Sequence, residues 1–241
     1  MEKIEFIEEH APADYLLKLD LTLPGWVSKS LRPDDLKRLR LAVNRFLELL
    51  SPLLFHHKSQ LGGFYSIHTW KTTKPLEPHL HVHLNVFNVA HNRKAKTFHR
   101  FKPLISHYKV KLAWRSALKS QGLWDSPLAT FLPDCHLGYI KLADRVRLMS
   151  RIRYIFRKPI VDMNKDIGNC DTSHVDPVWA RALLDYTPRQ VFVGWAVNLK
   201  RFGFKCSSKS VSPLCPCCGA WLEYEYVLKE IPPEIPWFTI D

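Results

Sequence analysis

The stretch that decides the fold is Pro78-His-Leu-His-Val-His-Leu-Asn-Val-Phe87, in which histidines alternate with aliphatic residues. Successive side chains of a β-strand point to opposite faces, so His79, His81 and His83 are expected on one face. The aliphatic residues between them then lie on the other face, where a core can bury them. Imidazoles two residues apart on a strand have fixed directions and can bind one divalent ion. The alternative is a polar strand face whose histidines are solvated or hydrogen-bonded.

The sequence on both sides of this strand predicts an α+β fold. Apolar periodicity and the positions of prolines and acids set the elements. In order, these are a strand over 15–23, a helix from Pro33 to Ser51-Pro52, strands over 63–70 and 79–87, a helix over about 104–119, a strand around 137–142, and a helix from Asp144 to Arg157 or Lys158. This order predicts a central antiparallel sheet with helices packed on one face.

The last predicted helix carries a tyrosine away from its apolar stripe. Leu148, Ile152 and Ile155 form the stripe that we expect to be buried. Tyr154 falls on the other side of the helix, among residues that include Arg147, Ser150, Arg151 and Lys158. A core tyrosine belongs on the apolar stripe, so Tyr154 is either an exposed residue of a basic helix or a functional group.

The chain is strongly basic, and the charge is unevenly distributed. Lys and Arg total 35 against 23 Asp and Glu, which gives a formal net charge of +12. Between Pro78 and Trp124 there is no Asp or Glu at all. A basic surplus favours polyanionic partners through attraction to phosphate and counterion release. We therefore expect this window to contact nucleic acid, through Arg93, Lys94, Lys96, Arg100 and Lys102, the alternative being a solvated face.

Three segments resemble motifs of the HUH endonucleases, the replication initiators of rolling-circle plasmids and viruses together with the related rolling-circle transposases. Residues 66–83 are similar to the metal-binding segment, in which a His-Thr-Trp strand precedes His-Pro-His-x-His-Val, although Glu77-Pro78 stands here in place of His-Pro. Asp20-Leu-Thr-Leu-Pro24 resembles the first-strand motif, and Arg153-Tyr-Ile-Phe-Arg-Lys-Pro-Ile160 resembles the helix that carries the nucleophile. The three occur in the order found in the family.

This resemblance implies an HUH-like sandwich with the histidine strand at the centre of its sheet. It also implies a Mn²⁺ or Mg²⁺ site at His79 and His81, with His68 as the third ligand and His83 or Asp20 as alternatives. The hydroxyl of Tyr154 would attack a phosphodiester of single-stranded DNA, at an origin or hairpin, and leave a 5′-phosphotyrosine. Arg153, Arg157 and Lys158 are then expected to contact the DNA.

One departure from the transposase pattern bears on the function. Those enzymes usually carry a second tyrosine four residues before the first, and this chain has Ser150 there. The resemblance is therefore to a single-tyrosine nickase that cuts and rejoins one strand, as in rolling-circle replication. Two alternatives are a rolling-circle transposase and a non-catalytic, zinc-containing nucleic-acid-binding protein on the same scaffold. A 2H-type phosphoesterase is a weaker third, because only His68-Thr-Trp hints at one of its two motifs.

The C-terminal third carries a cysteine pattern of its own. Cys215-x-x-Cys218 followed by Gly219 resembles one zinc knuckle, but a structural Zn²⁺ needs four ligands and a second such pair is missing. Cys206 or Cys217 could contribute to the site, with buried thiols and no metal as the alternative. The other residues that could complete it through space are Cys170, His174, Cys135 and His136. We expect a nuclease core over residues 1–165 and an appendage over residues 166–241.

The N-terminus and the hydropathy pattern suggest a location. Residues 1–10 are acidic and lack the apolar run of a signal peptide. No stretch approaches the roughly 18 to 20 apolar residues of a membrane span. We therefore expect an intracellular, cytoplasmic protein without membrane contact, whose six cysteines are reduced or metal-bound.

Overall fold

The computed structural model describes residues 2–24, 34–54, 59–70, 78–102, 105–124, 131–156 and 190–202. These belong to one unit, Met1–Phe202, and Gly203–Asp241 form a second unit that lies outside the described residues. The elements are α1 (Glu2–His10), β1 (Tyr15–Thr22), α3 (Asp35–Leu54), β2 (Gln60–Trp70), β3 (Pro78–Asn92), β4 (Thr97–Arg100), α4 (His107–Ser120), β5 (Cys135–Lys141), α5 (Arg145–Phe156), β6 (Val191–Gly194) and η1 (Trp195–Phe202).

The strands form one six-stranded antiparallel sheet with the histidine strand at its centre. The strand order is β5-β1-β3-β2-β6, and β4 pairs with the far end of β3. β3 therefore has a neighbour on each side along its first half, β1 and β2. The predicted α+β class and antiparallel sheet are confirmed.

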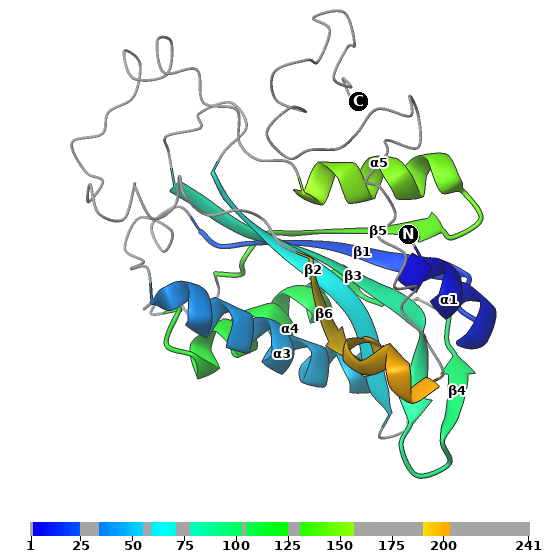
Figure 1. The fold of residues 1–241 in the computed structure, drawn as a ribbon. Helices are drawn as coiled ribbons and strands as arrows, with labels where there is room; N and C mark the ends of the chain where they lie inside the picture. The colour runs from blue at the N-terminus through cyan, green and yellow to red at the C-terminus, as the bar shows by residue number, and fades with distance from the viewer. Residues whose placement is uncertain are drawn as a thin grey trace, which may run out of the picture. The chain divides into compact units, whose positions relative to one another are not determined.

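The main hydrophobic core lies between one face of this sheet and the helices α3 and α4 (Figure 1). Leu80, Val82 and Leu84 are fully buried in it, as the alternation of β3 predicts. Each contributes about 1.5 to 3 kcal/mol by leaving water. The stripe of α3 faces the same core, and this helix continues through Pro52 to Leu54. The histidines alternate with these leucines and valines, so they are held on the opposite face.

Helix α5 covers that opposite face, so the prediction of helices on one face only is wrong. Figure 1 shows α5 on the other side of the sheet from α3 and α4. Its buried Leu148 and Ile155 lie outside the main core, as do Phe64 and Phe87 of β2 and β3. Around Phe64 and Phe87 the sheet carries apolar side chains on both faces, and a sheet of this kind is covered on both faces.

Several described elements lie outside the predicted ones. Helix α1, the short strand β4 and the pair β6 and η1 have no counterpart in the predicted order. Strand β6 pairs with β2, so residues beyond the predicted boundary at 165 belong to the sheet of the core. Among the described helices, none has the length and apolar character needed to cross a membrane.

Candidate metal centre

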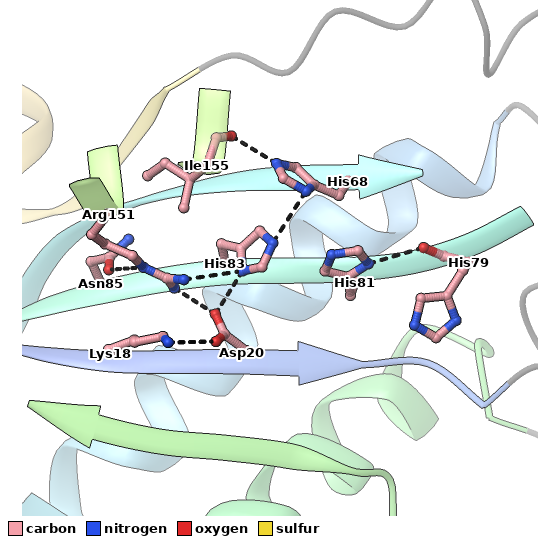
Figure 2. Close-up of polar contacts among 9 residues, drawn as sticks. All are labelled: Lys18, Asp20, His68, His79, His81, His83, Asn85, Arg151 and Ile155. Atoms are coloured by element: carbon pink, nitrogen blue, oxygen red, sulfur yellow. Dashed lines mark hydrogen bonds and ion pairs between the residues drawn. The ribbon is translucent and has the colours of Figure 1, made fainter. Parts of the chain in front are cut away.

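Three histidines from two neighbouring strands meet on the face covered by α5. His68 of β2, His81 and His83 each offer a ring nitrogen, and these nitrogens all lie within 4.8 Å of one another. His68 pairs with His81 across the β2–β3 ladder, and His83 is two residues further along β3. The pleat of two paired strands therefore brings the three rings together (Figure 2).

Oxygen acceptors fix the orientation of each ring. His68 donates its Nε2–H to the carbonyl of Ile155 at 2.9 Å, and His81 donates its Nδ1–H to the carbonyl of His79 at 3.0 Å. His83 donates its Nδ1–H to the carboxylate of Asp20 at 2.6 Å. Because these oxygens can only accept, each histidine presents its other nitrogen as a lone pair. The nitrogens turned toward the cluster are Nδ1 of His68, Nε2 of His81 and Nε2 of His83.

The spacing of two of these nitrogens suits a shared ion. His83 Nε2 lies 3.2 Å from His68 Nδ1. Two nitrogens about 2.1 Å from one ion, at angles of about 90° to 110°, lie about 3.0 to 3.4 Å apart. The cluster can therefore hold a metal ion with little movement of His68 and His83.

The pKa values of His81 and His83 favour the neutral, metal-binding form of these two histidines. Burial, together with the neighbouring His68, lowers the pKa of His81 to about 3. Burial also lowers the pKa of His83 to about 4, against the opposing effect of its hydrogen bond to Asp20. Neutral imidazole is the form that binds metal.

These pKa values predict an acid-sensitive fold in the metal-free protein. Below pH of about 6.5 the unfolded chain binds protons at His81 and His83, whereas the folded chain binds them only near their lowered pKa values. The free energy of unfolding should therefore fall by roughly a few kcal/mol as the pH drops from about 6.5 to about 4. Urea unfolding in the presence of a chelator measures this. His81→Gln, which does not titrate, should fall less steeply, and a flat profile in both proteins would contradict the expectation.

The carboxylate behind His83 belongs to a buried charged network. Asp20 Oδ1 also accepts from Nη2 of Arg151 at 2.5 Å, and its Oδ2 lies 3.3 Å from Nζ of Lys18. Burial alone would raise the pKa of Asp20, but the hydrogen bond from His83 and the charge of Arg151 hold it well below its usual range. Asp20 is thus an ionised acceptor that orients His83 and lies outside the three-histidine cluster.

Arg151 was missed as a site residue, because its charge placed it on the polar side of the predicted helix. It is only 6 % exposed, and its Nε donates to Oδ1 of Asn85 at 3.1 Å. Among the side chains of α5 that the structure describes, Leu148, Arg151 and Ile155 are buried, whereas Ile152, which we expected in the stripe, is half-buried. Nη1 of Arg151 also lies 3.4 Å from His83 Nδ1. Both of those atoms carry protons while His83 donates to Asp20, so this is a contact and not a hydrogen bond.

His79 lies beside the cluster and is not one of its three members. Its ring centroid is 5.3 Å from that of His81, and its carbonyl orients His81 (Figure 2). The expected ligands were His79, His81 and His68, but the register pairs His68 with His81 and not with His79, and it pairs Trp70 with Pro78. An irregularity between His68 and Trp70 accompanies this shift. His83, an alternative third ligand from the sequence, takes the place expected for His79.

Tyr154 lies next to the metal cluster. The centroid of its half-buried ring is 5.1 Å from that of His83 and 5.8 Å from that of His68. It is held there by α5, in which Arg151 and Ile155 contact the sheet one turn before and one residue after it. The structure therefore brings the predicted tyrosine to the predicted histidine strand.

The predicted basic residues separate into two places. Arg93, Lys94 and Lys96 are exposed at the turn between β3 and β4, where Asn92 Oδ1 accepts from two turn amides. Lys102 and Arg100 are exposed nearby, and Arg100 forms an ion pair with Asp14 at 3.1 Å. Arg153 is exposed on α5. The remaining candidates lie outside the described residues: Arg157, Lys158, Cys206, Cys215, Cys217 and Cys218.

The described site thus combines three convergent imidazole nitrogens, an ionised carboxylate with a buried arginine, and an adjacent phenol. Such a set can bind a divalent cation and present an oxygen nucleophile to a group bound at that cation. Comparisons of the chain with protein-family models, with curated proteins and with solved structures found no match.

Proposed function

We propose that the protein is a metal-dependent endonuclease and strand transferase of the HUH type, which nicks and rejoins single-stranded DNA through a 5′-phosphotyrosine. The observation that carries this proposal is the placement of Tyr154 beside His68 and His83. A phenol on a separate helix, adjacent to three histidines with converging lone pairs, is the arrangement that such a reaction requires.

The residues have distinct parts in the proposed reaction. A divalent ion held by His68, His81 and His83 would supply positive charge to the oxygens of the scissile phosphate. The hydroxyl of Tyr154 loses its proton, and its oxygen bonds to phosphorus as the bond from phosphorus to the 3′ oxygen breaks. The 3′ oxygen takes up a proton, which leaves a 5′-phosphotyrosine and a free 3′-hydroxyl. The reverse step rejoins the strand, because the phosphodiester bond energy is retained.

The ligand set favours one of the two expected ions. Mg²⁺ binds mainly oxygen ligands and rarely accepts imidazole. Mn²⁺ tolerates imidazole better, and the cluster consists of three histidines. We therefore propose Mn²⁺ in preference to Mg²⁺ at this site.

The proposed DNA contacts are widely spaced. Arg93 follows His83 by ten positions along β3 and its turn, which at about 3.3 Å per residue is roughly 30 Å. Duplex DNA covers that length in about nine base pairs. A strand at the metal cluster would therefore meet the basic turn only through a longer segment, such as the duplex stem beside a nick site.

The basic turn gives a prediction about salt dependence. Replacing Arg93, Lys94 and Lys96 by glutamine should make the dependence of log affinity on log salt less steep. The magnitude of the slope should fall by up to about 0.9 for each lost contact on a duplex, and by about 0.7 on a single strand. A fluorescent stem-loop titrated at several salt concentrations measures this. The matched control replaces Lys37, Arg40 and Arg45. These are three exposed cations of α3, which packs on the face of the sheet opposite the histidine cluster. Equal slopes for the two triple variants would show that the effect is one of net charge alone.

The experiment that tests the proposed function is a search for a protein–DNA adduct. The full chain is incubated with Mn²⁺ and a pool of random single-stranded oligonucleotides, and adducts are detected by a mobility shift that survives denaturation. The expected result is an adduct that a chelator prevents. Binding of the pool without any adduct would instead favour the non-catalytic alternative. Transfer of the bound strand to a second DNA duplex would favour a transposase.

A further inference from the structure

The candidate metal ligands and the tyrosine helix are joined in one circuit of polar contacts. Starting from α5, Arg151 donates to Asp20, which accepts from His83. His83 faces His68 across 3.2 Å, and His68 donates to the carbonyl of Ile155, back on α5 (Figure 2). Tyr154 lies in the segment of α5 between the two ends of the circuit.

The circuit contains one weak link in the absence of metal. If Nδ1 of His68 and Nε2 of His83 both present lone pairs, they repel each other at 3.2 Å. In the neutral rings, one imidazole must then shift its proton to the inner nitrogen or turn away, and either change removes the donation to Ile155 or to Asp20. An ion between the two nitrogens removes this conflict, because both lone pairs then bind it while both outer N–H groups keep their acceptors.

The remaining half of the circuit depends on a buried charge. Arg151 and His83 are 6 % and 2 % exposed, so the guanidinium has little water to solvate it. Apolar side chains at the same face, Leu148 and Ile155, show that a hydrophobic residue fits this layer. A buried ion pair is seldom the most stable way to fill such a site. Arg151 instead links three elements, since it bonds Asp20 of β1 and Asn85 of β3 from α5.

We propose that Arg151 and Asp20 are positioning residues that couple metal binding at His68 and His83 to the placement of the Tyr154 helix. Metal binding closes the circuit and holds α5 on the sheet at both ends of the segment that carries Tyr154. Without metal, α5 keeps its bonds through Arg151 and Ile155, but the contact between His68 and His83 that links them is weaker. The catalytic meaning of this coupling rests on the proposed function, but the coupling itself is a property of the protein and metal alone.

Hydrogen exchange tests the coupling without DNA. In the full-length wild-type chain, saturating Mn²⁺ should slow amide exchange in α5 by about tenfold or more, because local opening of the helix now breaks the circuit. Arg151→Met should bind Mn²⁺ within about threefold of the wild type, since all three histidines remain, yet lose most of this protection. Asp20→Asn should weaken Mn²⁺ binding by about 10- to 100-fold, because the acceptor behind His83 loses its charge.

Matched variants keep the test decisive. Arg147→Met removes an exposed arginine of the same helix, paired only to Asp144 in the described contacts, and should behave as wild type in both measurements. If Arg151→Met does not fold, Arg151→Lys replaces it. Lysine keeps the charge but lacks the planar fork that reaches both Asp20 and Asn85, so the protection should still be lost.

The outcomes separate this proposal from the function. Metal-dependent protection of α5 that persists in Arg151→Met and Arg151→Lys would overturn it, as would a wild-type chain whose α5 exchanges equally with and without Mn²⁺. If wild type forms no adduct but shows the protection, the proposed function fails and the coupling stands. If adduct forms, Arg151→Met should lower the rate of adduct formation at saturating Mn²⁺ by about 100-fold with unchanged DNA affinity, since misplaced nucleophiles act on the rate and not on binding.

Discussion

Replacing His68, His81 or His83 by alanine is expected to abolish Mn²⁺-dependent adduct formation, whereas replacing His79 is expected to leave it nearly intact. The three cluster histidines offer nitrogens within 4.8 Å of one another, and His79 is not among them. Loss of one of three protein ligands should weaken Mn²⁺ binding by about 100-fold or more, beyond the effect of losing an outer partner. His79→Ala retains the backbone carbonyl that orients His81, so its Mn²⁺ affinity should change by less than about threefold.

The series is read by calorimetric titration of Mn²⁺ into chelator-treated protein, with circular dichroism to show that each variant is folded. His79→Ala is the matched control, because it removes the same side chain from the same strand face. If His79→Ala loses as much affinity as His81→Ala, the ion is bound further along β3 than the cluster indicates. If all four variants form adduct equally well with a chelator present, the reaction needs no metal.

The strand pattern could be predicted because its period is simple. Alternation over Pro78–Asn92 depends only on the pleat, so the burial of Leu80, Val82 and Leu84 followed from the sequence. The sequence did not predict which residue pairs with His68. The register depends on the connection between β2 and β3 and on the irregularity between His68 and Trp70. Sequence therefore identified the histidine face and His68, and the structure selected the group of three.

The second face of the sheet was harder to predict. An amphipathic helix shows that it packs on something, but not on which face of a sheet. A signal existed in the strands, since Leu16-Leu17 and Val86-Phe87 put apolar residues on both faces at this end. Such runs are typical of strands covered on both sides.

Arg151 was missed as a site residue for a different physical reason. Hydrophobic patterning counts Arg151 as polar and assigns it to solvent, whereas its guanidinium is satisfied by Asp20 and Asn85 from two strands. Buried charges of this kind are stable only with partners in place, and those partners are 131 and 66 residues away in sequence. The sequence does offer one signal for a buried arginine. Arg151 lies one turn before the suspected nucleophile Tyr154, and the first strand carries an acid, Asp20.

Replacing Tyr154 by phenylalanine is expected to reduce the yield of covalent protein–DNA adduct by about 1,000-fold or more, because the change removes the hydroxyl that is proposed to attack the phosphorus. The change deletes one hydroxyl from a half-buried ring that packs near His68 and His83. The ring contacts remain, so the free energy of unfolding should change by less than about 1 kcal/mol. Mn²⁺ affinity should also stay within about threefold of wild type, since the three ligands are untouched.

The matched control for this variant is Tyr139→Phe. Tyr139 is an exposed tyrosine of β5 that pairs with Leu17, which places it on the sheet face opposite the histidines. Deleting its hydroxyl should leave adduct formation at the wild-type level. Both variants are assayed with the same oligonucleotide and Mn²⁺ on denaturing gels, and binding is measured separately by fluorescence anisotropy. Full adduct in Tyr154→Phe would assign the nucleophile to another residue, and loss of DNA binding together with adduct would make Tyr154 a binding group, because a nucleophile acts after the strand is bound.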